Sequence, residues 1–92
     1  MANDPRKPVA VVIGVGPGLG TAVARRFAAG YTVAIVARNA EYLAKLAAEI
    51  GASAGDARPI PANVAEESAI EAAFATIRRE IGDPEVLPYK FA

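Results

Sequence analysis

The residues best suited to chemistry in this chain are four glycines within residues 14–20, which read GVGPGLG. They directly follow an apolar run and open a segment whose apolar residues have helical spacing. At such a junction Gly14 permits a tight turn, Gly18 lets the backbone approach a pyrophosphate, and Gly20 lets the helix pack close to the strand. Amide groups at the head of the helix, together with its dipole, favour a bound diphosphate. The segment therefore predicts a dinucleotide site formed by Gly14, Gly16, Gly18, Leu19 and Gly20.

The alternative is a ligand-free turn in which the glycines only supply positive φ angles. A glycine pattern alone is weak evidence, and the spacing here is G-x-x-x-G-x-G rather than G-x-G-x-x-G. A simple turn, however, needs only about one or two glycines. This segment has four, and it lies between a predicted strand and a predicted helix, so we favour the diphosphate site.

Other catalytic and metal-binding chemistries have little support. The chain has no cysteine and no histidine, which excludes disulfides, thiolate catalysis, Cys/His zinc sites and any Ser-His-Asp relay within it. Glutamates at positions 66, 67 and 71 could suggest a carboxylate cluster, but no other ligand type accompanies them. A solvated helix face explains them better, and we expect no metal site.

Length and charge restrict the partners. The 92 residues suffice for one small domain, 1–92, and 53% of them are hydrophobic, which favours a packed core over disorder. Ten basic and ten acidic residues cancel, so we expect no attraction to nucleic acid or to an anionic membrane surface. The amino-terminal sequence MANDPRKP is too polar for a signal peptide, and the apolar run 9–15 is too short to span a membrane. We expect a cytoplasmic protein.

Strand and helix signals alternate along the chain. Uninterrupted apolar runs rich in β-branched residues predict buried strands, whereas apolar residues spaced by three and four predict helices. Asn39 is a suitable N-cap for the second helix. The predicted strands are Val9–Ile13, Tyr31–Ala37, Ala57–Ala62 and Glu85–Tyr89, and the predicted helices are Leu19–Ala29, a helix that follows Asn39 and runs to about Ile50, and Glu66–Ile81.

This alternation predicts an α/β fold, a Rossmann-type doubly wound parallel sheet of four strands in the order 3-2-1-4 with three helices. The third strand contains two prolines, which fit a sheet edge because a missing N–H breaks no ladder there. The first two helices should cover one face of the sheet and the third helix the other. We expect Gly30, Gly51 and Gly82 to end the three helices and Gly55-Asp56 to form a turn.

With these elements in place, the chain resembles the short-chain dehydrogenase/reductase family from about Pro8 to Ala92. Members carry T-G-x-x-x-G-x-G after the first strand. In this chain the three glycines of that motif are matched at positions 14, 18 and 20, and Ile13 replaces the threonine. The likeness extends to an Ala-Arg pair after the second strand and to Asn63-Val64, which stands where the family has an Asp-Val-like pair. The resemblance implies the cofactor-binding half of an oxidoreductase.

The residues that end the second strand bear on cofactor choice. In the family an acidic residue at this place binds the ribose 2′-hydroxyl and selects NAD. Here the matching residue is the uncharged Ala37, and Arg38 follows at once. A guanidinium suits a 2′-phosphate, so the resemblance implies NADP in preference to NAD. The alternative for Arg38 is a solvated loop cation.

Asn63 and Val64 stand where the resemblance implies contacts with adenine. The Asn63 amide oxygen could accept a hydrogen bond from the adenine amino group, and Val64 would offer its backbone. The alternative for Asn63 is a loop or capping role, which asparagine often takes.

The catalytic half of the family pattern has no match in this sequence. The family's Tyr-x-x-x-Lys pair and serine lie further along, and none of Tyr31, Tyr42 and Tyr89 has a lysine four residues later. We interpret these tyrosines as packing or surface residues. The family's N-A-G segment appears as Lys90-Phe91-Ala92, so we do not assign it to cofactor binding.

Three functions remain open from the sequence. The chain could be the NADP-binding portion of an oxidoreductase, inactive by itself because it lacks the catalytic residues. It could be a stand-alone nucleotide-binding module without chemistry, or a structural, self-assembling unit. We also expect a homo-oligomer, formed through the outer edge of the fourth strand or a thinly covered sheet face.

Overall fold

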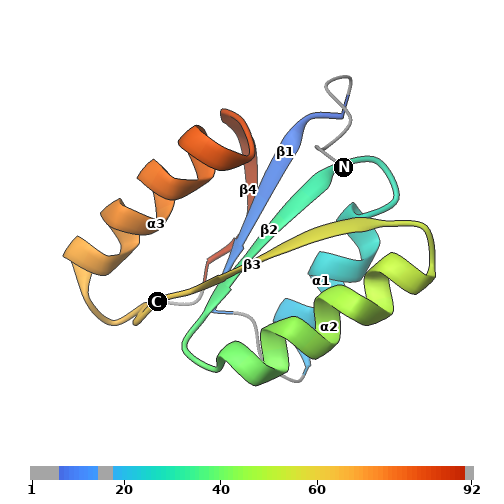
Figure 1. Cartoon of the computed structure of the whole chain (residues 1–92), viewed down its shortest axis with the longest axis horizontal. Helices are drawn as coiled ribbons and strands as arrows, with labels where there is room; N and C mark the ends of the chain where they lie inside the picture. The colour runs from blue at the N-terminus through green and yellow to red at the C-terminus, as the bar shows by residue number, and fades with distance from the viewer. Residues whose placement is uncertain (1–6, 15–17, 91–92) are drawn as a thin grey trace.

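Two strands buried on both faces form the centre of the molecule. β1 (Val9–Ile13) and β2 (Thr32–Ala37) are buried at every position, because their residues, all apolar except Thr32, can meet helices on either side of a sheet. The structure is a computed structural model that describes residues 7–14 and 18–90 (Figure 1). The other elements are α1 (Leu19–Phe27), α2 (Ala40–Ala52), β3 (Asp56–Pro61), α3 (Glu67–Glu80) and β4 (Pro84–Lys90).

The four strands form one parallel sheet in the order β3-β2-β1-β4, which confirms the predicted topology. At the carboxyl ends of the strands, Ile13 of β1 pairs with Val36 of β2 and with Lys90 of β4. Ala37 of β2 pairs with Pro61 of β3. The strands therefore end at one level, and the loops that follow β1, β2 and β3 meet along one edge of the sheet.

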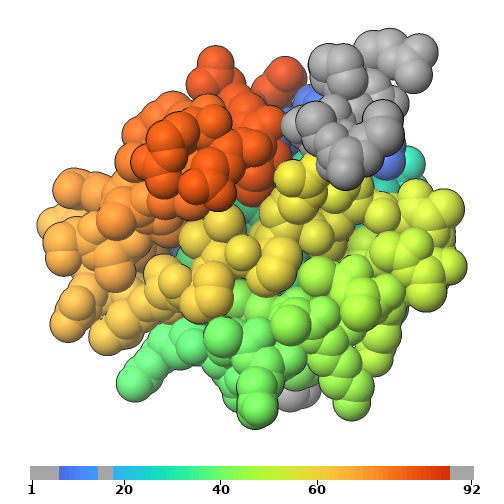
Figure 2. Space-filling model, in the orientation of Figure 1, coloured from blue at the N-terminus to red at the C-terminus, as the bar shows by residue number. Residues whose placement is uncertain are grey.

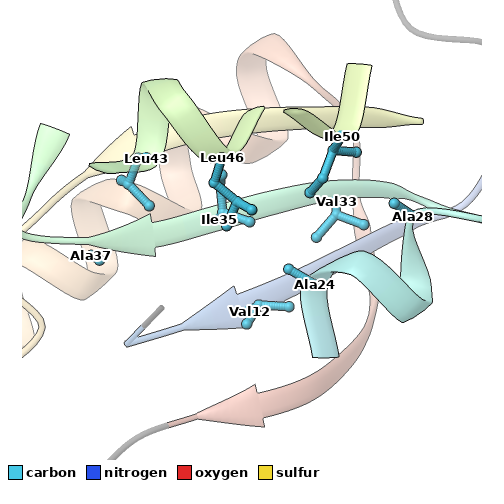
Figure 3. Close-up of a cluster of buried hydrophobic side chains, with 9 residues drawn as sticks. All are labelled: Val12, Ala24, Ala28, Val33, Ile35, Ala37, Leu43, Leu46 and Ile50. Atoms are coloured by element: carbon cyan, nitrogen blue, oxygen red, sulfur yellow. The ribbon is translucent and has the colours of Figure 1, made fainter. Parts of the chain in front are cut away.

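The helices cover the sheet unequally, as predicted. In Figure 1, α1 and α2 lie on one face and α3 lies alone on the other. Figure 3 shows the first face, where Leu43, Leu46 and Ile50 of α2 point toward Val33 and Ile35 of β2. On the second face, the residues of the strands alternate with these and pack against α3, through the set Val9, Val11, Ile13, Ala34, Val36, Ala73, Ile77 and Ile81.

Two of the three predicted helix stops are wrong. α1 ends at Phe27, before the predicted Ala29, because the Phe27 carbonyl already accepts hydrogen bonds from the amides of Gly30 and Tyr31. α2 continues through Gly51 to Ala52, and it is Ala54, with φ of 68°, that takes the left-handed position after the helix. At Gly82 the prediction is confirmed, since this residue has φ of 150° and its amide bonds the Ile77 carbonyl at 2.9 Å.

The predicted turn at Gly55-Asp56 is also wrong, and the glycine has a different purpose. The turn lies at Ser53–Ala54, and Asp56 already begins β3. A Cβ at position 55 would stand 2.6 Å from Cγ2 of Ile50 and 3.2 Å from Cβ of Ala28. Gly55 is therefore required by the close approach of the chain to α1 and α2 rather than by a bend.

β3 is the outer strand on one side of the sheet, as its prolines predicted. It starts and ends one residue earlier than expected, and Pro59 and Pro61 are both exposed. Figure 2 shows the strand, in yellow, crossing the surface between α3 and α2. β4 begins at Pro84, one residue before the prediction, and its pairing with β1 contains register shifts.

Candidate functional site

The predicted binding residues meet at the carboxyl edge of the sheet, on the three neighbouring loops that leave β1, β2 and β3. The Gly14 amide donates a hydrogen bond to the Val36 carbonyl at 2.7 Å, which ties the first loop to β2. The Ala62 amide donates to the Ala37 carbonyl at 2.8 Å, which ties the third loop to the same strand. These two bonds hold the loops on either side of β2, directly before Arg38.

The glycine turn needs its glycines for conformational reasons at two positions. Gly14 has φ of 86°, and Gly18, the N-cap of α1, has φ of 110° and ψ of −131°. L-residues with side chains rarely adopt such angles. A Cβ at Gly18 would meet no atom within 4 Å, so the space beside this backbone is open. The predicted residue Gly16 lies outside the described residues.

The head of α1 presents amide groups to this open space. The helix begins its hydrogen-bonding pattern with the Ala22 amide, which donates to the Gly18 carbonyl at 3.0 Å. The amides of Leu19 and Gly20 precede that bond, and the first turn contains no acidic residue. Gly20 is buried against the fold, whereas the Leu19 side chain is 65% exposed. These features fit a diphosphate, because the first amides of a helix and the positive end of its dipole favour an anion.

Arg38 is an exposed cation beside the glycine turn. It directly follows the buried Ala37 at the end of β2. Within the described part of the chain it makes no hydrogen bond and no ion pair. A guanidinium in this state keeps its donors available for a planar or tetrahedral anion.

Asn63 has the turn-forming role that the sequence left open. Its side-chain Oδ1 accepts a hydrogen bond from the Ala65 amide at 3.0 Å, and its carbonyl accepts one from the Glu66 amide at 3.0 Å. The adenine contact that the resemblance implies would have to use the second lone pair of Oδ1. Val64 is half-buried, and its side chain packs against the core cluster that includes Ala73 and Ile77.

The structure also brings together two residues that the sequence did not connect with the site. The hydroxyl groups of Thr21 and Tyr42 share a hydrogen bond between α1 and α2. The Tyr42 ring also packs partly against the buried residues between the sheet and α1 and α2, which agrees with the predicted packing role. We call these residues the first core cluster: Val12, Ala24, Ala28, Val33, Ile35, Ala37, Leu43, Leu46 and Ile50. No sequence signal could have found the pair, because the residues lie on different helices.

A second polar cluster lies at the opposite, amino-terminal edge of the sheet. Asp56 accepts hydrogen bonds from Nε of Arg58 at 2.7 Å and from Oγ1 of the buried Thr32 at 3.3 Å. The Arg58 hydrogen bond holds the pKa of the Asp56 carboxyl below its ordinary value, and partial burial opposes this shift. Asp56 is thus a paired, structural carboxylate and takes no part in the candidate site.

Other features of the described residues add no competing site. A hollow of about 530 Å³ opens at the amino-terminal edge, and its lining includes Arg25, Ala28, Ile50 and Ser53. No group of three or more acidic side chains is placed to hold a metal ion in the part of the chain that the structure describes. Within the same residues, no helix is long and apolar enough to cross a membrane.

Comparison with known sequences points to one family. The family model described as short chain dehydrogenase matches residues 8–88. The chain is 36% identical over 80 residues to a 2,3-dihydro-2,3-dihydroxybenzoate dehydrogenase of Bacillus subtilis, a match that covers 86% of this chain and 31% of the relative. It is 40% identical over 83 residues to the short-chain reductase protein NovJ of Streptomyces niveus, covering 89% of this chain and 32% of the relative. The chain therefore spans about a third of these relatives' length.

Solved structures give the same result for the fold. An actinorhodin polyketide ketoreductase variant with NADPH superposes with a TM-score of 0.84 at 31% identity, over 95% of this chain and 33% of the other. A metagenomic short-chain oxidoreductase in complex with NADP superposes with a TM-score of 0.81 at 33% identity, over 87% of this chain and 37% of the other. Both superpositions place this chain on a part of a longer α/β protein.

Proposed function

This chain belongs to the short chain dehydrogenase family, and from that premise we propose that it binds NADP(H) at the carboxyl edge of its sheet. The observation that carries the proposal is the glycine turn at the head of α1. Two glycines there have positive φ angles, the space beside Gly18 is open, and the amides of Leu19 and Gly20 precede the first helical hydrogen bond, which supports a diphosphate at this place. We propose Gly14, Gly16, Gly18, Leu19 and Gly20 as the diphosphate-binding residues.

The preference for NADP over NAD is proposed from Arg38. Its guanidinium is exposed and unpaired among the described residues, and Ala37 brings no carboxylate that would repel a phosphate. The NADPH and NADP named for two structural neighbours support this choice. Asn63 and the Val64 backbone are proposed to border the adenine.

In this scheme the chain binds and orients the cofactor, and the cofactor would supply the redox chemistry. When bound, the nicotinamide would supply hydride transfer to or from a carbonyl or alcohol substrate. The residues of this chain would hold the diphosphate and the 2′-phosphate, and the sequence lacks the family's Tyr-x-x-x-Lys pair, whose tyrosine acts as general acid or base. We propose that the 92-residue chain has no oxidoreductase turnover by itself. NADPH oxidation by the pure chain with any of a panel of carbonyl compounds would contradict this.

Calorimetric titration tests the binding proposal. We expect a Kd on the order of 10 µM for NADP⁺, equivalent to about 7 kcal/mol, and at least about tenfold weaker binding of NAD⁺. Titration with 2′-phospho-ADP-ribose, which lacks nicotinamide, should retain most of the affinity. Heat signals indistinguishable from dilution with all three ligands at millimolar concentration would refute NADP(H) binding. The third function that the sequence left open, a structural unit whose glycines only shape a turn, would then be favoured.

We also propose that the chain self-associates through β4. This strand is the outer member of the described sheet on the side away from β3, and its Leu87 is 48% exposed. The outer edge of such a strand presents backbone N–H and C=O groups with which another strand can pair. Sedimentation velocity at high micromolar concentration should show a dimer or larger species, and a single monomeric boundary would count against the proposal. The cytoplasmic location expected from the sequence stays a prediction.

A further inference from the structure

The two halves of the proposed site are carried by different helices. The diphosphate turn leads into α1, whereas Arg38 lies on the short connection between β2 and α2. Thr21 is the third residue of α1 and Tyr42 is the third residue of α2, and their hydroxyl groups are hydrogen-bonded to each other. This bond therefore joins the two helices within one turn of the places where the proposed cofactor contacts begin.

A second bond continues the connection toward Arg38. The Tyr42 amide donates a hydrogen bond to Oδ1 of Asn39 at 3.0 Å, and Asn39 directly follows Arg38. The Tyr42 ring is half-buried against the first core cluster, and these contacts limit its movement. Thr21, Tyr42 and Asn39 thus form a continuous path from α1 to the residue beside the guanidinium.

A different pair joins the same helices at their other ends. Arg25 of α1 forms an ion pair with Glu49 of α2, and the two side chains are 47% and 45% exposed. Both residues lie in the later turns of their helices, away from the carboxyl edge of the sheet. Either bridge could hold α1 and α2 together. Breaking the ion pair between Arg25 and Glu49 therefore tests for a general effect on helix packing, separate from an effect on the site.

We propose that Tyr42 is a positioning residue for cofactor choice. Through Thr21 and Asn39 it holds Arg38 at a fixed distance from the diphosphate turn, so that one ligand can engage both at once. A ligand with two anionic groups gains affinity when its two contact points are held at the matching separation. NAD⁺ does not engage Arg38 through a 2′-phosphate and should be insensitive to the bridge. This inference rests on the proposed binding of NADP(H) and deepens it.

The test compares NADP⁺ and NAD⁺ binding by calorimetry in matched variants of the full chain. Tyr42→Phe keeps the ring and removes the hydroxyl. We expect it to weaken NADP⁺ binding by about fivefold, the size expected of one hydrogen bond, and to change NAD⁺ binding by less than about twofold. Thr21→Val should reproduce this loss, whereas Thr21→Ser should keep the unmodified ratio of the two affinities. The double variant Tyr42→Phe/Thr21→Val should lose no more NADP⁺ affinity than either single variant, because both changes remove the same hydrogen bond.

Glu49→Gln is the control, because it breaks the other bridge between the same helices. We expect it to leave the ratio of the NADP⁺ and NAD⁺ affinities unchanged. An unchanged ratio in both Tyr42→Phe and Thr21→Val, or an equal shift of the ratio in Glu49→Gln, would overturn the role of Tyr42 while leaving the proposed function intact. Failure of the unmodified chain to bind either nucleotide would overturn both. Thermal unfolding of each variant identifies any that has lost its fold, and Thr21→Val decides the matter if Tyr42→Phe is among them.

Discussion

Arginines and glycines at the two edges of the sheet have different environments. At the amino-terminal edge, Arg58 is paired with Asp56, which also accepts a hydrogen bond from Thr32, and both members of the ion pair are more than two-thirds buried. At the carboxyl-terminal edge, Arg38 is exposed and has no ion-pair partner among the described residues. One arginine thus satisfies its donors inside the fold, and the other keeps them available.

The glycines show the same contrast. Gly55, at the amino-terminal edge, is needed because Ile50 and Ala28 occupy the space that a side chain would take. Gly18, at the carboxyl-terminal edge, is needed for its backbone angles while the space beside it is open. The comparison shows that close packing at Gly55 and the ion pair between Asp56 and Arg58 stabilise the fold at the first edge, beside the hollow that opens there. The proposed ligand would bind at the second edge, and substitutions at the two edges should therefore have separable effects.

The largest expected effect is the loss of cofactor binding in Gly18→Val. A β-branched residue rarely adopts φ of 110°, so the turn must change its path and move the amides of α1. We expect NADP⁺ affinity to fall by at least about 100-fold, measured by calorimetry, which corresponds to nearly 3 kcal/mol. Gly30→Ala is the matched control, since the new methyl group would meet no atom within 4 Å and the φ of Gly30 is not positive. If Gly18→Val kept its NADP⁺ affinity, the proposed role of the carboxyl-terminal edge in binding would be wrong.

Gly55→Ala should have the complementary effect at the other edge. The new methyl group would stand 2.6 Å from Ile50, and the overpacking should lower the free energy of unfolding by about 2 kcal/mol, measured by urea denaturation. Cofactor affinity of the folded protein should not change. Gly51→Ala is the matched variant, since Gly51 lies in α2 and a new methyl group there would meet no atom within 4 Å. Because alanine favours a helix more than glycine does, we expect the free energy of unfolding to rise by about 0.5–1 kcal/mol. Equal stabilities of the two variants would show that the close approach at Gly55 is unimportant.

The two arginines give a paired test of intermediate size. Arg38→Ala should weaken NADP⁺ binding by about 20-fold, because charge-assisted bonds to the 2′-phosphate are lost, and it should leave both NAD⁺ binding and unfolding nearly unchanged. Arg58→Ala should lower stability and leave the NADP⁺ to NAD⁺ preference intact. If Arg58→Ala altered the preference as strongly as Arg38→Ala, the proposed division between the two edges would fail.

The smallest predicted effect concerns Asp56 and pH. Because its pKa is lowered in the folded protein, ionised Asp56 stabilises the fold at neutral pH, and this contribution is lost as the pH falls from the unfolded value of 3.8 through the folded one. Asp56→Asn should lower the free energy of unfolding by about 1 kcal/mol at pH 7, and the difference from the unmodified chain should shrink below about pH 4. Urea denaturation between pH 7 and pH 3 measures this. A difference independent of pH would mean that the ion pair contributes nothing.

Local and topological features of this fold could be predicted from the sequence. The N-cap at Asn39 was predictable because its side chain bonds an amide only three residues away, in Tyr42. The strand order followed from the alternation of elements and the handedness of their connections, and it placed Gly14, Arg38 and Asn63 on neighbouring loops.

Features that depend on how elements pack could not be read from the sequence. The close approach of Gly55 to Ala28 and the bridge between Thr21 and Tyr42 each join different elements, and neither leaves a periodic signal. The predicted ends of α1 and α2 were wrong because a glycine was interpreted as the end of each helix. The actual ends depend on which carbonyl groups accept the last helical hydrogen bonds, and the sequence does not show this. The turn formed by Asn63 was one of two alternatives, and the sequence could not choose between them.

Backbone NMR during titration with NADP⁺ tests the central claim, that amides at the glycine turn hold the diphosphate. We predict that the amide signals of Gly14, Gly18, Leu19 and Gly20 shift as the ligand saturates, while those of Thr32, Gly55 and Asp56 at the opposite edge stay in place. Shifts confined to the amino-terminal edge, or none at the head of α1 under saturating NADP⁺, would contradict the account.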